Sequence, residues 1–297
     1  MYPDIDSIAC FVAAAKTLNF RAAARSVALT PAALGKRIAQ LEDLMGGRLF
    51  ERTTRHVSLT PTGQALLPQA LKLLAVAEAC VEAGRGRAGP APVKLLIGTR
   101  HELGMSWILP MLPVLAEALP HVEINLYFGS GPDLEERVKG FDVHCAVTSR
   151  VFVDPIFDVI RLVREDYVFV AAPSLVERTP FETADDAGRH VLVDVQPEKP
   201  LFKYLRDAEG APHFPRFGDE RIMGTTAAVR HVIATGGGVG VLPKYLVQAD
   251  IRSGRLSRLL PELELGFDHF RLMYRHDDPR ADLYRQLADV MRPQPLS

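Results

Sequence analysis

One stretch of the chain carries side chains that could contact DNA. Residues 31–45 form a helical pattern in which, at about 100° per residue, Leu34 and Ile38 fall on one side. The opposite face is small, with one cation, Lys36, and one amide, Gln40. Small residues allow close approach to another surface, and these two side chains can reach phosphates or base edges. A solvated helix rich in alanine for its helix propensity is the alternative of equal weight.

The neighbouring sequence favours DNA binding. Thr30 followed by Pro31 is a helix start signal, a short helix from Phe20 precedes it, and Asp6 is the expected N-cap of a first helix. Residues 48–63 predict a hairpin with a basic tip, which a winged helix-turn-helix places along the phosphate backbone. The predicted DNA-contacting residues are Thr30, Ala32, Ala33, Gly35, Lys36, Arg37, Gln40, Arg52, Thr53 and Arg55.

Polar residues follow several predicted strands in the rest of the chain. In open parallel sheets, ligands bind beyond the carboxyl ends of strands, where helix N-termini present their amides. Hydroxyls, amides and two arginines, Arg100 and Arg150, in these places suit a small carboxylate or a similar anion. Each residue alone fits an ordinary helix cap or loop polar residue, but the group favours a binding site. The predicted set is Thr99, Arg100, His101, Gly129, Ser130, Thr148, Ser149, Gln196, Thr225 and Thr226.

Charge is unevenly distributed along the 297 residues. Residues 1–92 hold eleven Lys and Arg against seven Asp and Glu, whereas the remainder holds 24 against 29. This asymmetry predicts that only the first third meets a polyanion. No signal peptide and no apolar run of membrane-spanning length is present, so a cytoplasmic protein without a membrane partner is expected. No nucleotide, metal or catalytic motif occurs, which predicts no cofactor, no metal and no enzyme.

Two further patterns complete the organisation. From residue 61 to about residue 84, apolar positions repeat at spacings of three and four, as in a coiled-coil seam, although Pro68 should kink that helix unless packing absorbs the effect. From Val93 onward strands alternate with helices, which predicts an α/β fold with a largely parallel sheet. Its strands include 141–147, 156–163 and 167–171, and the glycines of 236–238 are expected to form a helix C-cap and tight turn.

The stretch from Phe11 to Gly63 resembles the N-terminal domain of LysR-type transcriptional regulators. The helix pair, the Gly-Arg-Leu-Phe turn of 47–50, the Arg-Thr wing and the Leu-Thr-Pro-x-Gly of 59–63 occur in the family's order. Two positions depart from the commonest pattern, since Pro31 stands where glutamine is frequent and Gly35 where serine is frequent. Base contacts should therefore depend more on Lys36, Gln40 and Arg37.

The resemblance implies three parts. These are a winged helix-turn-helix over 1–60, a dimerising linker helix over 61–86 and an effector domain over 93–297. The effector domain would have two α/β lobes like those of periplasmic solute-binding proteins, lobe I from 93–163 and 267–297 and lobe II from 164–266. The implied partners are an inverted-repeat operator in double-stranded DNA, a small effector and further copies of the chain in a dimer or tetramer, with RNA polymerase as an additional candidate.

Three functions are consistent with these patterns. The first is a transcriptional regulator whose effector domain binds an anionic metabolite as co-inducer. The second is an enzyme with a DNA-binding appendage, which the lack of a catalytic constellation disfavours. The third is an architectural or constitutive DNA-binding protein that has no effector. A ligand screen that measures both thermal stability and turnover would separate them.

Overall fold

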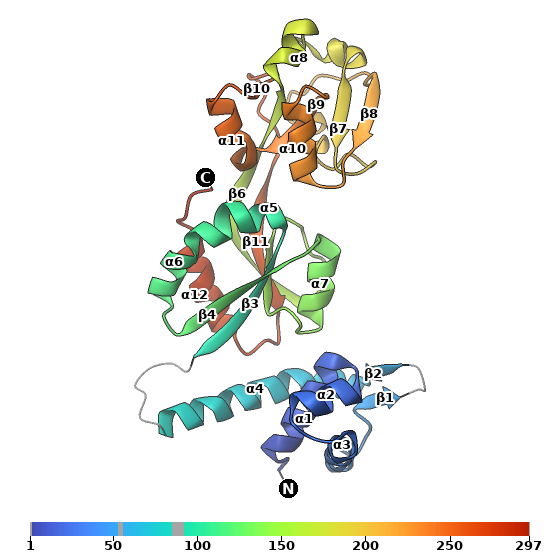
Figure 1. Cartoon of the computed structure of the whole chain (residues 1–297), viewed down its shortest axis with the longest axis vertical. Coiled ribbons are helices and arrows are strands. Elements are labelled where there is room, and N and C mark those ends of the chain that lie inside the picture. The colour runs from blue at the N-terminus through green and yellow to red at the C-terminus, as the bar shows by residue number, and fades with distance from the viewer. Residues whose placement is uncertain (1, 53–55, 85–91, 297) are drawn as a thin grey trace.

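The computed structural model describes residues 2–52, 56–84 and 92–296. Figure 1 shows an N-terminal helical unit, one long helix, α4, and two α/β lobes stacked above them. Hydrophobic clusters fill the helical unit and each lobe, and Phe141 of the first lobe joins the cluster of the helical unit. None of the helices in the described ranges is long and apolar enough to span a membrane.

The N-terminal unit contains the three predicted helices, α1 (Ile5–Thr17), α2 (Phe20–Ser26) and α3 (Pro31–Met45). Their apolar stripes meet in one cluster, with Phe11, Leu34 and Ile38 fully buried. The N-cap of α1 is Asp4, which accepts a hydrogen bond from the Ser7 amide, so the prediction of Asp6 was wrong. Both acids precede the apolar stripe, and the helix begins early enough to place Asp6 in its first turn.

A two-stranded hairpin follows α3. Strand β1 (Phe50–Arg52) pairs antiparallel with β2 (Val57–Leu59), as predicted, while the tip at 53–55 lies outside the described residues. The hairpin packs tightly against the start of α4, because a Cβ at Gly63 would lie 2.2 Å from the Leu49 carbonyl oxygen. Glycine is therefore required where the hairpin and the long helix meet.

Helix α4 (Pro61–Gly84) runs continuously through Pro68. Its first half belongs to the N-terminal cluster, where Leu67 and Ala70 are buried. Its second half exposes apolar side chains, with Val76 and Val81 each 53% exposed. The predicted seam therefore packs on its own domain at one end and is open at the other.

The first lobe contains most of the elements between residues 93 and 148, together with the last helix. These are β3 (Val93–Thr99), α5 (His101–Leu103), the π-helical turn η1 (Gly104–Ile108), α6 (Leu109–Ala118), β4 (Val122–Phe128), α7 (Gly131–Lys139), β5 (Cys145–Thr148) and α12 (Ala281–Met291). Helices α6 and α12 cover one face of the sheet and α7 covers the other (Figure 1). The predicted strand at 141–147 begins only at Cys145, because Phe141 adopts a positive φ of 62° in the turn after α7.

The second lobe contains the elements between residues 173 and 258. These are α8 (Pro173–Arg178), the 3-10 helix η2 (Ala184–Arg189), β7 (Val191–Asp194), α9 (Lys203–Arg206), β8 (Asp219–Ile222), α10 (Thr226–Ala234), β9 (Val239–Pro243), α11 (Lys244–Arg252) and β10 (Ser257–Arg258). Gly236, at φ 78°, turns the chain between α10 and β9, which confirms the predicted C-cap and turn.

Two long strands join the lobes. Strand β6 (Phe157–Ala171) is one continuous strand where two were predicted, and β11 (Phe267–Arg275) runs antiparallel beside it. The strand order is β4-β3-β5-β11-β6-β9-β7-β8, with β10 also on β6. The sheet is parallel toward its two ends and antiparallel at its centre, so the prediction of a largely parallel sheet was wrong. The difference arises because β6 and β11 run between the lobes in opposite directions and pair antiparallel at the centre of the sheet. The predicted domain and lobe boundaries remain predictions.

Candidate DNA-binding and ligand-binding sites

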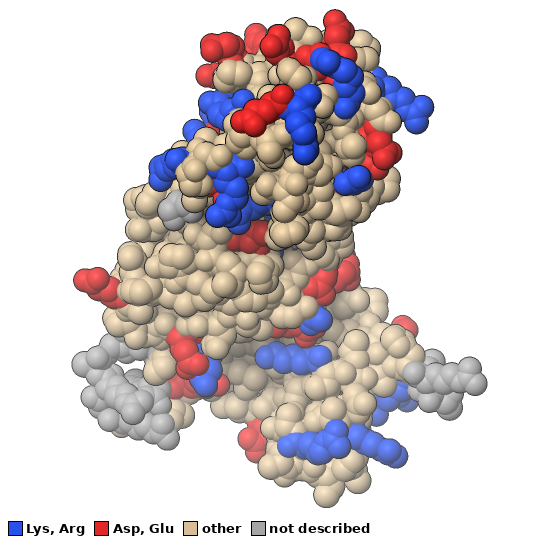
Figure 2. All heavy atoms as spheres, turned by 45° about the horizontal axis from the view of Figure 1, so that its top comes forward, with Lys and Arg blue, Asp and Glu red and all other residues tan. Residues whose placement is uncertain are grey.

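Helix α3 presents the small and polar face that its sequence predicts. Ala32, Lys36 and Gln40 are exposed, and Ala33 and Gly35 are half-buried. A Cβ at Gly35 would meet nothing within 4 Å. Within the described residues, Lys36 and Gln40 have no protein partner. This face is therefore open to contact with another surface, and Figure 2 shows Lys and Arg side chains on the outer side of the N-terminal unit.

Arg37 belongs to a different side of α3. Its guanidinium lies 3.0 Å from the Asp6 carboxylate and 3.6 Å from that of Asp4. Arg37 follows buried Leu34 by three residues, so the two share a side of the helix. These ion pairs fix α3 against the start of α1, and the contact of Arg37 with DNA bases stays a prediction.

Thr30 and Arg52 have structural partners as well. The Thr30 hydroxyl oxygen accepts a hydrogen bond from the Ala33 amide and caps α3. The Arg52 guanidinium lies 4.2 Å from the centre of the Phe20 ring and 3.6 Å from the Glu42 carboxylate. Arg52 therefore fixes the base of the hairpin. Thr53 and Arg55, predicted at its tip, lie outside the described residues.

Glu42 connects α3 to the hairpin. Its carboxylate accepts hydrogen bonds from the backbone amides of Leu49 at 2.9 Å and Phe50 at 3.3 Å. Only 11% of its side chain is exposed. The sequence analysis did not single out this residue, although an acid one turn before the end of α3 could have indicated a contact with the following turn.

Replacing Glu42 with alanine should destabilise the N-terminal domain by about 1–3 kcal/mol, because two backbone amides lose their acceptor. Chemical denaturation followed by far-UV circular dichroism measures the change. Glu51→Ala is the matched control, since Glu51 lies exposed on the same hairpin. Equal stability of the two variants would show that Glu42 does not hold the hairpin.

Three of the predicted ligand-binding residues converge at the junction of the lobes. Arg100 follows β3, and its Nη2 donates a hydrogen bond of 3.0 Å to the Ser149 hydroxyl, which follows β5. The same nitrogen lies 3.6 Å from the Glu165 carboxylate on β6. Thr99, beside Arg100, is fully buried. The carboxyl ends of the parallel strands β3 and β5 thus lie beside β6, at the edge where ligands bind in open parallel sheets.

Glu165 is the functional candidate that sequence reasoning missed. The residue is completely buried, and neither carboxylate oxygen has a partner at ordinary hydrogen-bond geometry, although the Tyr167 and Ser149 side chains lie near enough to lower its pKa. Burial raises the pKa of Glu165, and the Arg100 charge offsets part of that rise. Thr99 Oγ1 and Arg100 Nε are also buried without hydrogen-bond partners. Charge alone did not single out Glu165, because it stands between Arg164 and Asp166; the available signal was strand alternation, which turns its side chain to the face opposite theirs.

A second pair of groups meets across the lobes. Glu102 on α5 accepts a hydrogen bond of 3.3 Å from the Ala227 amide at the start of α10. Thr225 caps the same helix by accepting a hydrogen bond from Ala228, and Thr226 is its first residue. The Glu102 carboxylate of lobe I therefore accepts a hydrogen bond from an amide at the N-terminus of α10. A ligand carboxylate would bind at the same position.

The other predicted ligand-binding residues serve local roles. His101 packs its ring 5.5 Å from that of Phe128. The Gly129 amide bonds to the Thr99 carbonyl, and the Ser130 carbonyl accepts the Leu134 amide at the start of α7. The Thr148 hydroxyl accepts the Arg150 amide. Gln196 is exposed, and its carbonyl accepts the Lys199 amide in the turn after β7. Within the described residues, these side chains form no hydrogen bond or ion pair with Arg100 or Glu165.

Comparison with known proteins identifies both domains. Residues 5–64 match the model of the bacterial regulatory helix-turn-helix proteins of the LysR family, and residues 91–295 match the LysR substrate binding domain. A glycine cleavage system transcriptional activator of Escherichia coli K12 is 27% identical over 86% of this chain and 81% of its own.

Two solved structures have the same fold. ArgP from Mycobacterium tuberculosis aligns with a TM-score of 0.72 at 21% identity, covering 97% of this chain and 95% of its own. LysG from Corynebacterium glutamicum, with bound effector Arg, aligns with a TM-score of 0.66 at 19% identity, covering 98% of this chain and 97% of its own. With both domains matched in the family's order, the chain belongs to the LysR-type transcriptional regulators.

Proposed function

We propose that this regulator recognises a specific operator through α3 and the wing. The observation that carries the proposal is the open face of α3, where Lys36 and Gln40 are exposed among small residues. A major groove accepts such a helix, with lysine directed to phosphates and glutamine to an adenine edge. Two copies would read an inverted repeat, and a DNA partner makes the cytoplasm the expected compartment.

Helix α4 supports dimerisation of the chain. Its second half exposes Leu73, Val76 and Val81, and the last two lie beyond Leu74, which still packs on the N-terminal domain. A helix from another copy would bury these side chains in a coiled-coil contact. A tetramer and a contact with RNA polymerase are further parts of this proposal, and analytical ultracentrifugation with and without operator DNA tests the assembly.

The effector is proposed to be a small metabolite that carries a carboxylate. Arg100 offers a partly buried cation, and the N-terminus of α10 offers amides on the opposing lobe. One of those amides already donates a hydrogen bond to the Glu102 carboxylate, so a ligand carboxylate would displace Glu102 from it. A bound arginine in LysG and the glycine system named for the E. coli relative make amino acids part of the first panel to test.

A thermal-shift screen with small carboxylates and amino acids tests the effector site. An effector should raise the melting temperature of the wild-type protein, since a ligand that binds the folded state stabilises it. The shift should be lost in Arg100→Ala and reduced in Thr226→Ala. Thr235→Ala is the matched control, because Thr235 lies at the opposite end of α10. Full responses in Arg100→Ala and Thr226→Ala would exclude this site.

The alternative is a constitutive regulator that has no effector. The Glu102 contact favours it, because the chain supplies its own carboxylate between the lobes. A screen in which no compound shifts the melting temperature, while operator binding stays intact, would support this alternative. We retain the prediction that the chain is not an enzyme, and turnover of a panel compound would contradict it.

A further inference from the structure

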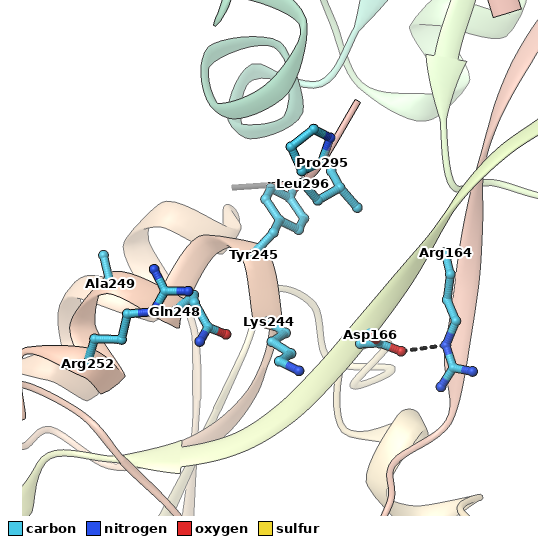
Figure 3. Close-up of a pocket in the computed structure, with 9 residues that line it drawn as sticks. All are labelled: Arg164, Asp166, Lys244, Tyr245, Gln248, Ala249, Arg252, Pro295 and Leu296. Carbon is cyan, nitrogen blue, oxygen red and sulfur yellow. Dashed lines mark hydrogen bonds and ion pairs between the residues drawn. The ribbon is translucent and has the colours of Figure 1, made fainter. Parts of the chain in front are cut away.

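A hollow lies beside strand β6, where Arg164 and Asp166, the neighbours of Glu165 in the sequence, belong to its lining (Figure 3). Its volume is about 560 Å³. Helix α11, strand β6 and the C-terminal segment contribute its walls. The lining residues that matter are Arg164, Asp166, Lys244, Tyr245, Gln248 and Arg252. The hollow therefore touches the crossing strand, lobe II and the segment that follows α12.

The charge of this hollow is predominantly positive. Three cationic side chains face one carboxylate, and the Arg164 Nε already bonds to Asp166 at 2.5 Å. Lys244 and Arg252 have no partner among the described residues, and Gln248 lines the hollow on the same helix. Figure 2 shows Lys and Arg side chains gathered on the side of the molecule where α11 lies. The wall supplied by α11 therefore has two free cations and an amide.

Helix α11 lacks the anion that its N-terminus favours. Lys244 is its first residue, Pro243 provides no side-chain cap, and no acid lies in its first turn. The helix dipole disfavours a cation at this end and favours an anion. Asp250, on the same helix, already pairs with Arg230 and Arg255 and so leaves Arg252 free. An anion in the hollow would relieve the repulsion at Lys244.

Aromatic packing links the hollow to the hydrophobic core of the first lobe. The Tyr245 ring lies 5.8 Å from that of Phe270, which lies 6.0 Å from Trp107. Burial, followed by the Glu165 charge, raises the pKa of Tyr245. The Trp107 indole donates a hydrogen bond to the Gln294 carbonyl, next to the lining residue Pro295.

We propose that this hollow is a second ligand site, for a small multivalent oxyanion such as a phosphate or a polycarboxylate. Lys244 and Arg252 bind its charge, and Gln248 donates a further hydrogen bond. Because the walls come from both lobes and from β6, occupancy shifts the balance between lobe arrangements if the ligand binds one more tightly than the other. The site is independent of the effector proposed above.

The full-length protein can be titrated with inorganic phosphate, and in a separate arm with citrate, at constant pH and ionic strength. Trp107 is the single tryptophan of the chain, so its fluorescence reports on the C-terminal segment beside the hollow. Wild-type protein should give a saturable change. Lys244→Gln and Arg252→Gln should each raise the half-saturating concentration about tenfold, the effect of about 1.4 kcal/mol. Lys72→Gln, an exposed lysine on α4, should behave as wild type.

Equilibrium dialysis with radiolabelled phosphate provides a second readout on the same proteins. Stronger binding of phosphate than of citrate would favour a phosphorylated ligand, and the reverse would favour a polycarboxylate; either result supports the proposal. A linear response, an equal loss in Lys72→Gln and Lys244→Gln, or no binding of either anion by dialysis would overturn it.

Discussion

Replacing Arg100 with alanine is expected to lower the free energy of unfolding of the C-terminal domain by about 3–5 kcal/mol. The loss arises because Glu165 is fully buried and Arg100 is its cationic partner at 3.6 Å. Without that charge, the carboxylate remains in a poorly solvated place without a cationic partner. Urea denaturation followed by the fluorescence of Trp107, which lies in the first lobe, measures the change.

A second substitution isolates the cause. Adding Glu165→Gln to Arg100→Ala should recover much of the lost stability, because the unpaired charge disappears. A double-mutant cycle over the four proteins then gives the coupling between the two side chains. If Arg100→Ala and the double variant are equally unstable, lost packing and not the buried charge explains the effect.

The same pair predicts a pH dependence. Burial raises the pKa of Glu165 above its value in the unfolded chain. The folded protein therefore binds the Glu165 proton more tightly than the unfolded chain does. This contribution to the free energy of unfolding is fully present below the pKa of Glu165 in the unfolded chain, and it is lost as pH rises through the pKa of Glu165 in the folded protein. Relative to wild type, Glu165→Gln should become progressively more stable as pH rises through this window. A difference that does not vary with pH would contradict the raised pKa.

The second large effect concerns operator choice. Gln40→Ala should relax discrimination at one base pair by about 1–3 kcal/mol if the amide makes a bidentate contact with adenine. Lys36→Ala should weaken binding to all DNA and reduce the slope of log K against log salt by about one. Fluorescence anisotropy with matched and single-mismatch duplexes at several salt concentrations measures both quantities.

Two exposed residues away from α3 serve as controls. Gln286→Ala on α12 and Lys72→Ala on α4 remove the same side-chain types from other parts of the surface. Neither should alter the mismatch penalty. An unchanged mismatch penalty in Gln40→Ala, together with an unchanged salt slope in Lys36→Ala, would show that the other side of α3 meets the DNA.

Local elements could be predicted from the sequence because their signals are local. Thr30 caps α3 as expected, and the apolar stripe of α3 is buried where helical spacing places it. The N-cap of α1 was misassigned because Asp4 and Asp6 carry the same signal two residues apart. The ion pair of Arg37 with Asp6 was not predicted, although the spacing of Arg37 from Leu34 already placed it toward the protein.

The ligand site was only partly predictable, since it depends on contacts between distant segments. Arg100 and Ser149 each follow a parallel strand, and the structure places them together, as expected for residues beyond the carboxyl ends of such strands. It could not indicate that Glu165 would lie against Arg100, because that contact depends on the path of β6 between the lobes. The contact from Glu102 to α10 depends likewise on how one lobe faces the other.

Selection of binding sites from random duplex DNA by the full-length protein tests the central claim most directly. The claim is that a symmetric pair of winged helices reads DNA through the open face of α3. Enrichment of an inverted repeat is predicted, with half-site centres about 10 base pairs or a multiple of that apart, and with a base preference that Gln40→Ala relaxes. Recovery of no common sequence, or of one that Gln40→Ala leaves unchanged, would contradict the claim.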